Sequence, residues 1–143
     1  MSRLDDAVNC FCRGAACSQA ILGMYGPSLG LPREQAMKLA SGFAGGMRLA
    51  QTCGAVTGAF MVLGLKHAGA NCDQRDGRNE VYAALREFTT KFQQRNNSVV
   101  CKELLGCDIS TPEGAQKATK EGLFRTICPK LVQDAAEILE QML

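Results

Sequence analysis

Apolar residues along this chain recur at steps of three and four, which is the period of one face of an α-helix. The clearest series is formed by Val81, Tyr82, Leu85, Phe88 and Phe92. It predicts an amphipathic helix from about Arg78 to Arg95. No stretch alternates apolar and polar residues, and no Asn-Gly or Asp-Gly pair joins two apolar runs as in a β-hairpin. The pattern therefore predicts an all-α protein, a bundle of about six or seven helices.

Glycine, proline and capping residues divide the rest of the chain into further helices. The expected ranges are Leu4 to Arg13, Ala16 to Tyr25, Pro32 to Phe43, Thr52 to Ala68, Val99 to Leu105, Thr111 to Gly122, and Pro129 to the C-terminus. The range from Thr52 to Ala68 is almost wholly apolar, so it is expected to be the buried central helix. Because no linker, repeat or low-complexity stretch divides the chain, we expect residues 1–143 to form one domain.

Composition and charge exclude several classes of protein. Apolar residues make up 46% of the chain and charged residues 21%, as in globular proteins. A net charge of +2, with the basic residues scattered, predicts no nucleic-acid partner. The longest nearly uncharged apolar run, Cys53 to Leu65, has 13 residues, whereas roughly 20 are needed to span a bilayer. We therefore expect no membrane span, and the lack of a secretory signal predicts a cytoplasmic protein.

The unusual feature is the presence of eight cysteines in 143 residues. Such density is typical of small secreted disulfide scaffolds, but this chain has no export signal and is long enough to fold by burial. Four of the cysteines fall at expected helix starts, where free N–H groups and the helix dipole favour a thiolate. These four are Cys17, Cys53, Cys101 and Cys128. Thr52 is the candidate cap of the helix that contains Cys53, and Ser98 that of the helix that contains Cys101. The alternative is that they are small buried hydrophobes placed by packing.

The other four cysteines form a different group. Cys10 and Cys12 lie two residues apart in one helix, so they point to different faces and cannot jointly bind one ion. Cys72 lies in a polar loop. We interpret these three as structural or incidental. Cys107 follows Gly106, the expected end of a helix, and could approach Cys101, which makes it a candidate fifth member of the first group.

Two glycines follow Cys53 one helical turn apart. Gly54 and Gly58 would give the central helix a flat groove, at a cost of roughly 1 kcal/mol each relative to alanine. Close packing of a second helix would offset that cost. So would approach of the backbone to a bulky group near Cys53, which makes Gly54 a candidate cofactor contact.

Several short stretches taken together resemble a known family. They are Ala16-Cys17-Ser18-Gln19-Ala20, Lys38-Leu39-Ala40-Ser41-Gly42-Phe43-Ala44-Gly45-Gly46-Met47, Cys53-Gly54-Ala55-Val56-Thr57-Gly58, Cys101-Lys102-Glu103-Leu104-Leu105-Gly106 and Cys128-Pro129. This set resembles the C_GCAxxG_C_C family of redox-active proteins, named for four cysteines and a CGAxxG motif. The resemblance runs from about Leu4 to the C-terminus. It implies that the four family cysteines are Cys17, Cys53, Cys101 and Cys128.

The resemblance also bears on cofactors. A related cysteine-bearing region occurs in split-Soret cytochromes, where it accompanies c-type haems and has been thought to hold an iron–sulfur centre. This chain contains no C-x-x-C-H sequence, so we expect no c-type haem. With a single histidine, His67, there is also little case for a histidine-rich metal site.

Three hypotheses for the four cysteines follow. The first is a redox centre, either an iron–sulfur cluster held by all four or a thiol/disulfide couple of two. The second is structural zinc, which ranks lower because separations of 36, 48 and 27 residues lack the local pairs of zinc sites. The third is a helical interaction module with purely structural thiols. A redox role implies a redox partner, which no motif identifies. The sequence leaves open whether the protein is an enzyme and whether it forms a homodimer.

Overall fold

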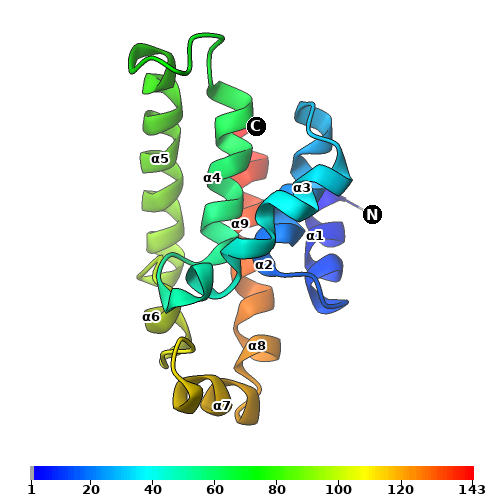
Figure 1. Ribbon diagram of the computed structural model, residues 1–143, viewed down its shortest axis with the longest axis vertical. Coiled ribbons are helices and arrows are strands. Elements are labelled where there is room, and N and C mark those ends of the chain that lie inside the picture. The colour runs from blue at the N-terminus through cyan, green and yellow to red at the C-terminus, as the bar shows by residue number, and fades with distance from the viewer. Residues whose placement is uncertain (1) are drawn as a thin grey trace.

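The computed structural model describes residues 2–143 and confirms the all-α prediction (Figure 1). Its helices are α1 (Arg3–Cys12), α2 (Cys17–Tyr25), α3 (Arg33–Ala40), α4 (Gly54–His67), α5 (Asn79–Asn96), α6 (Cys101–Leu105), α7 (Pro112–Lys120), α8 (Leu123–Thr126) and α9 (Cys128–Met142). Short 3₁₀ turns are η1 (Pro27–Leu29), η2 (Ser41–Phe43) and η4 (Asp76–Arg78). The described part of the chain has no strand, and its one isolated bridge pairs Thr52 with Val100.

The described residues form nine α-helices, more than the six or seven expected and one more than the eight ranges named, because very short segments are also helical. The four-residue α8 was not predicted; it begins directly after Gly122, whose carbonyl accepts hydrogen bonds from the N–H groups of Arg125 and Thr126. The helix expected from Pro32 to Phe43 ends early, at Ala40. The buried hydroxyl of Ser18 donates to the Ala40 carbonyl at 2.8 Å, and the backbone is extended at Ala44. A tertiary contact therefore helps to end this helix.

The prediction of a buried central helix is confirmed. Helix α4 packs against α2, α5 and α9 (Figure 1), and its Val56, Val62 and Leu63 have no exposed surface. Phe88 and Phe92 of α5 stack against each other in this core with their ring centroids 6.0 Å apart. A second, smaller cluster of buried residues lies beside the main core. Its members are Ala50, Cys101, Leu105, Ile109 and Ala118.

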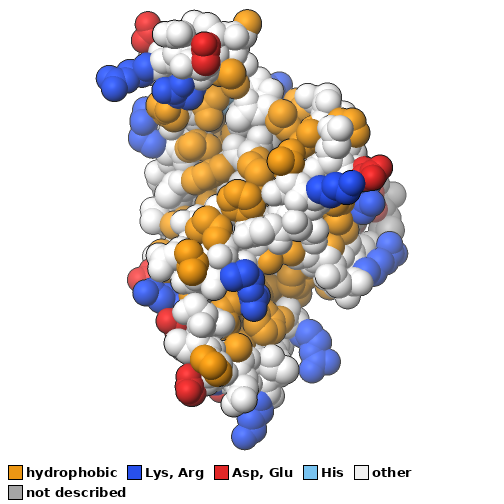
Figure 2. Space-filling view, viewed as in Figure 1, with side chains coloured by type: hydrophobic (Ala, Val, Ile, Leu, Met, Phe, Trp, Pro, Cys, Tyr) orange, Lys and Arg blue, Asp and Glu red, His pale blue; other side chains and the backbone are white. Residues whose placement is uncertain are grey.

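The outer surface carries both apolar and charged groups. Figure 2 shows hydrophobic side chains in a band across the face that α3 and α4 share, and Leu39 and Leu65 flank a groove there. On the α5–α9 side, the largely buried carboxylate of Asp134 accepts hydrogen bonds from Arg95, Asn96 and Lys130. Within residues 2–143 no helix combines the length and the apolar character needed to cross a membrane.

Candidate functional site

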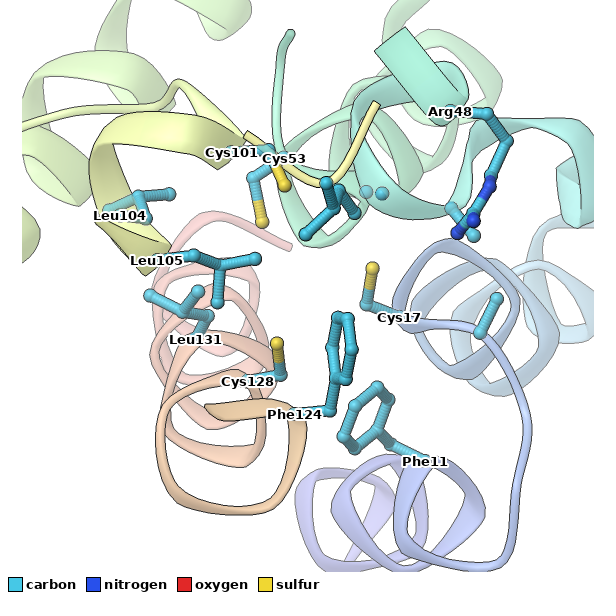
Figure 3. A pocket seen from close by; sticks show the side chains of 15 residues that line it. Phe11, Cys17, Arg48, Cys53, Cys101, Leu104, Leu105, Phe124, Cys128 and Leu131 are labelled. Carbon is cyan, nitrogen blue, oxygen red and sulfur yellow. The ribbon is translucent and has the colours of Figure 1, made fainter. Parts of the chain in front are cut away.

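The four cysteines at the expected helix starts line one cavity of about 140 Å³ (Figure 3). Each comes from a different helix. Cys17 is the first residue of α2, Cys53 caps the start of α4, Cys101 is the first residue of α6, and Cys128 is the first residue of α9. The cavity lies where the main core meets the smaller cluster, because Cys53 belongs to the former and Cys101 to the latter. Residues 36, 48 and 27 positions apart are thus brought together by the tertiary fold.

A short backbone bridge places Cys53 beside Cys101. The N–H of Cys53 donates to the carbonyl of Val99 at 2.7 Å, and the N–H of Cys101 donates to the carbonyl of Gln51 at 2.5 Å. These bonds flank the antiparallel pairing of Thr52 with Val100. The prediction that Thr52 caps the central helix is therefore wrong. Thr52 is part of the bridge, and Cys53 itself is the N-cap residue of α4. Ser98 accepts from the N–H of Val100 at 2.9 Å, one residue before α6.

The start of α2 is held by side chains on both sides of Cys17. The Gln19 carbonyl oxygen accepts from the N–H of Ala16 at 2.9 Å, and its amide donates to the Met37 carbonyl at 3.0 Å. On the other face, the Ser18 hydroxyl bonds to the end of α3. Cys17 therefore sits on a helix terminus fixed against α3.

Gly54 and Gly58 let α4 approach α2 closely, as the close-packing explanation expects. A Cβ at Gly58 would lie 2.9 Å from the Ser18 carbonyl oxygen and 3.1 Å from the Cβ of Ile21, which is helix packing. A Cβ at Gly54 would lie only 2.4 Å from the Sγ of Cys17. Gly54 thus provides the space that the Cys17 sulfur occupies.

Among the four cavity thiols, the pKa is lowered at Cys17 alone. The largest cause is a hydrogen bond from the Cys53 thiol to the Cys17 sulfur, which stabilises the thiolate. Backbone N–H groups of Gly45, Ser18 and Cys17 act in the same direction, whereas burial opposes them. The net effect lowers the pKa of Cys17 from 9.0 to about 7. The reciprocal hydrogen bond, together with burial, raises the pKa of Cys53 well above 9.0.

The expectation that a helix start favours a thiolate at all four positions is wrong for three of them. Burial is the largest cause at Cys101 and Cys128, and it raises their pKa values to about 11 and about 12. Neighbouring sulfurs raise these pKa values further, since each disfavours a second negative charge. Helix α6 has five residues, and so short a helix has only a small dipole to offset the burial.

The remaining cysteines lie outside the cavity wall. Cys107 packs against the smaller cluster and is close enough to Cys101 to raise its pKa, so the expected approach to the Cys101 region is confirmed. It does not line the cavity. Cys10 and Cys12 lie in α1, and Cys72 lies exposed in the loop after α4.

Most of the cavity wall is apolar, and the one charged side chain that the described residues contribute to it, Arg48, was not predicted from the sequence. Phe11, Phe124 and Leu131 are among the apolar lining residues. Arg48 extends along one edge of the cavity (Figure 3). Arg48 directly follows the family stretch that ends at Met47 but is not part of it, and the only other local signal is the preceding Gly45-Gly46 pair.

The family suggested by the motifs is shown by comparison with family models. Residues 15–142 match the model described as "Putative redox-active protein (C_GCAxxG_C_C)". The chain belongs to this family. No curated protein and no solved structure is similar enough to extend the comparison. The C_GCAxxG_C_C match covers all four cavity cysteines, and it supports a redox role without specifying a reaction.

The four cavity thiols are the candidate donors for a metal centre. Four thiols are the right number for either zinc or an iron–sulfur cluster. Among residues 2–143, however, no three His, Cys, Asp or Glu side chains are arranged to hold a metal ion. Four sulfurs bound to one zinc at about 2.3 Å would have to converge on a point, whereas these sulfurs surround a cavity. The arrangement therefore gives no support to zinc.

Proposed function

We propose that this protein is a thiol-based redox protein whose active couple is Cys17 and Cys53. The observation that supports the proposal best is that both thiols line one cavity, where the Cys53 thiol is the largest cause of a Cys17 pKa lowered to about 7. A thiol/disulfide couple needs an attacking thiolate at ambient pH and a second thiol within reach. Cys17 meets the first need and Cys53 the second.

The chemistry follows from the unequal pKa values. The Cys17 thiolate attacks one sulfur of a disulfide R–S–S–R′, breaking that S–S bond and releasing R–S⁻. Cys53, losing its proton to a released thiolate, then attacks the Cys17 sulfur and releases R′–S⁻. The protein pair is oxidised to a disulfide by two electrons, and the substrate is reduced to two thiols. A reductant of the dithiol class must restore the pair, and this cycle agrees with a cytoplasmic location, where thiols are kept reduced.

Disulfide mapping tests this proposal directly. Reduced protein would be oxidised with one equivalent of bis(2-hydroxyethyl) disulfide and digested, and its cross-linked peptides would be identified by mass spectrometry. We expect a Cys17–Cys53 link that dithiothreitol reverses. C17S should abolish the fast reaction, whereas C53S should stop at the mixed disulfide on Cys17. C12S and C72S are matched controls, because these cysteines lie outside the cavity.

A predominant link between any other pair, or unchanged kinetics in C17S, would refute the assignment. Folding of each variant can be verified independently by circular dichroism. Helix content near that of the parent protein would exclude a misfolded variant as the reason for lost reactivity.

An iron–sulfur cluster is the second candidate, favoured by the observation that all four sulfurs line one cavity. Cys17, Cys53, Cys101 and Cys128 would be its ligands, and a bound cluster would supply one-electron transfer. The backbone N–H groups that help to lower the pKa of Cys17 would also help to stabilise a negatively charged centre. The apolar wall would limit access of water to it.

The double variant C101A/C128A separates the two candidates. The thiol couple needs neither residue, so the variant should still form the Cys17–Cys53 disulfide. A cluster needs all four ligands, so anaerobically purified variant should lose the iron, sulfide and visible absorption that the parent protein would then carry. Colourless, iron-free parent protein with a reversible Cys17–Cys53 couple would eliminate the cluster.

A further inference from the structure

Arg48 introduces a positive charge into a cavity wall that is otherwise apolar or made of thiols. Among residues 2–143 no carboxylate lines the cavity, and the sequence has no Asp or Glu between Glu34 and Asp73. Within residues 2–143, Arg48 has no ion pair and no side-chain hydrogen bond. The guanidinium, which can present five donors to a planar anion, is therefore available to a ligand.

An unusual backbone directs this side chain toward the cavity edge. Gly45, Gly46, Met47 and Arg48 are four consecutive residues with positive φ between 60° and 63°. A left-handed conformation costs a non-glycine residue roughly 1–2 kcal/mol, so Met47 and Arg48 adopt it against their own preference. The turn is enclosed by its neighbours, because a Cβ at Gly45 would lie 2.7 Å from the Cδ1 of Ile109. The backbone N–H of Gly45 also helps to lower the pKa of Cys17, so the same turn serves both the thiolate and Arg48.

The charge of Arg48 is not one of the main causes of the lowered pKa of Cys17. The hydrogen bonds and burial that set the Cys17 pKa do not include Arg48. Its charge acts weakly on Cys101, where burial still raises the pKa to about 11. Stabilising the thiolate is therefore not the main role of this side chain.

We propose that Arg48 is an anion subsite of the cavity. The inference rests on the proposed thiol couple, and it makes the substrates of that couple small disulfides with a carboxylate on a short arm. A cavity of about 150 Å³ with apolar walls can take a group the size of benzene, about six heavy atoms. The cavity here, of about 140 Å³, would accept a three-carbon carboxylate arm with its sulfur. The arm would pack between Phe11 and Phe124, with its carboxylate on Arg48 and its sulfur near Cys17.

Three disulfides of similar size and different charge test the subsite. They are 3,3′-dithiodipropionate (anionic), bis(2-hydroxyethyl) disulfide (neutral) and cystamine (cationic). Second-order rate constants for Cys17 would be measured at pH 7 and low ionic strength by quenched alkylation and mass spectrometry. We expect the anionic disulfide to react fastest and cystamine slowest. The preference should shrink as salt screens the charges.

Variants of Arg48 assign the preference to that residue. R48N removes the charge, and asparagine tolerates a left-handed backbone, so the turn should persist. It should lower the ratio of anionic to neutral rate constants about tenfold, as expected for loss of one charge-assisted hydrogen-bonded pair. R48K should recover part of the ratio. R86Q is the matched control, because Arg86 is exposed on α5 and does not line the cavity.

Binding of an unreactive probe keeps this proposal separate from the thiol couple. Suberate has the length and charge of 3,3′-dithiodipropionate without its S–S bond, and an NMR titration would detect its binding. We expect suberate to bind the parent protein and R86Q, and to bind R48N about tenfold more weakly. If no disulfide reacts at Cys17, the thiol couple fails while the suberate titration still decides the subsite. Equal binding of suberate to R48N and R86Q, or a preference for the anionic disulfide that persists in R48N, would overturn the proposed anion subsite.

Discussion

Replacing Gly54 by alanine is the sharpest perturbation of Cys17 that leaves every cysteine in place. The added Cβ would lie 2.4 Å from the Cys17 Sγ, 3.1 Å from the Phe43 carbonyl oxygen and 3.2 Å from the Ser18 nitrogen. Two of these neighbours are backbone atoms, so the sulfur must move. Moving it breaks the hydrogen bonds from Cys53 and from the backbone that lower its pKa. We therefore expect the Cys17 pKa in G54A to rise toward 9.0.

The kinetic effect can be worked out from these values. A pKa rise from about 7 to 9.0 lowers the thiolate fraction at pH 7 from about one half to about 1%, roughly fiftyfold. The more basic thiolate is about tenfold more nucleophilic, for a Brønsted slope of about 0.5. Alkylation of Cys17 at pH 7 should therefore slow only about fivefold. The stronger signature is the midpoint of the pH–rate profile, which should move up by about 2 units.

The assay is iodoacetamide alkylation between pH 5 and 10, with the Cys17 peptide followed by mass spectrometry. G58A controls for packing, because its Cβ would press on Ser18 and Ile21 and not on the sulfur. G64A controls for helix propensity, since a Cβ there meets nothing within 4 Å. It should stabilise α4 by up to about 1 kcal/mol, whereas G58A should lose about 1–3 kcal/mol to overpacking. A G54A midpoint still near 7 would show that the spacing between Gly54 and the sulfur does not set the Cys17 pKa.

Three further predictions follow from the burial and pairing of charged groups. First, differential alkylation at pH 8 should label Cys17 well before Cys101 and Cys128, whose pKa values are raised to about 11 and about 12; equal labelling in the folded protein would contradict this order. Second, Cys17, with its folded pKa lowered to about 7, should add stability to the reduced protein that is complete above pH 9 and lost as the pH falls through 7. Cys101 and Cys128, whose pKa values are raised by folding, should lower the free energy of unfolding as the pH rises above 9. Urea unfolding should therefore show stability that rises from pH 7 to 9 and falls beyond it. The rise should be absent in C17S. Third, D134A should destabilise the protein by about 2 kcal/mol in urea unfolding, because it leaves Asn96 and Lys130 without their carboxylate. Its Cys17 reactivity should stay unchanged, since Asp134 does not line the cavity.

The helix starts could be predicted because local chemistry marks them. Pro129 follows Cys128 at a position that favours the first turn of a helix, and the apolar series of α5 has the period of a helical face. Those signals act within a few residues along the chain. They placed four cysteines at helix termini without any knowledge of how the helices pack.

The cavity itself depends on contacts between distant segments, which no local signal reports. The bridge that joins Cys53 to Cys101 uses the carbonyls of Val99 and Gln51, and any two non-proline residues could make it. The left-handed turn is marked only by Gly45-Gly46, whereas Met47 and Arg48 adopt positive φ because their surroundings impose it. For this reason Arg48 could not be identified from the sequence.

The four sulfurs share one kind of position and differ in their chemistry, which shows that a helix start alone does not activate a cysteine. Helix dipoles and free N–H groups contribute at most a few kcal/mol, and burial in apolar surroundings opposes them. At Cys101 and Cys128 burial is the larger effect. At Cys17 the balance reverses. The Cys53 thiol and the N–H of Gly45 in the left-handed turn lower its pKa, in addition to the N–H groups at its own helix start. Both additions come from other parts of the chain, so the reactivity proposed for Cys17 is a property of the tertiary fold and should be lost before the helices themselves unfold.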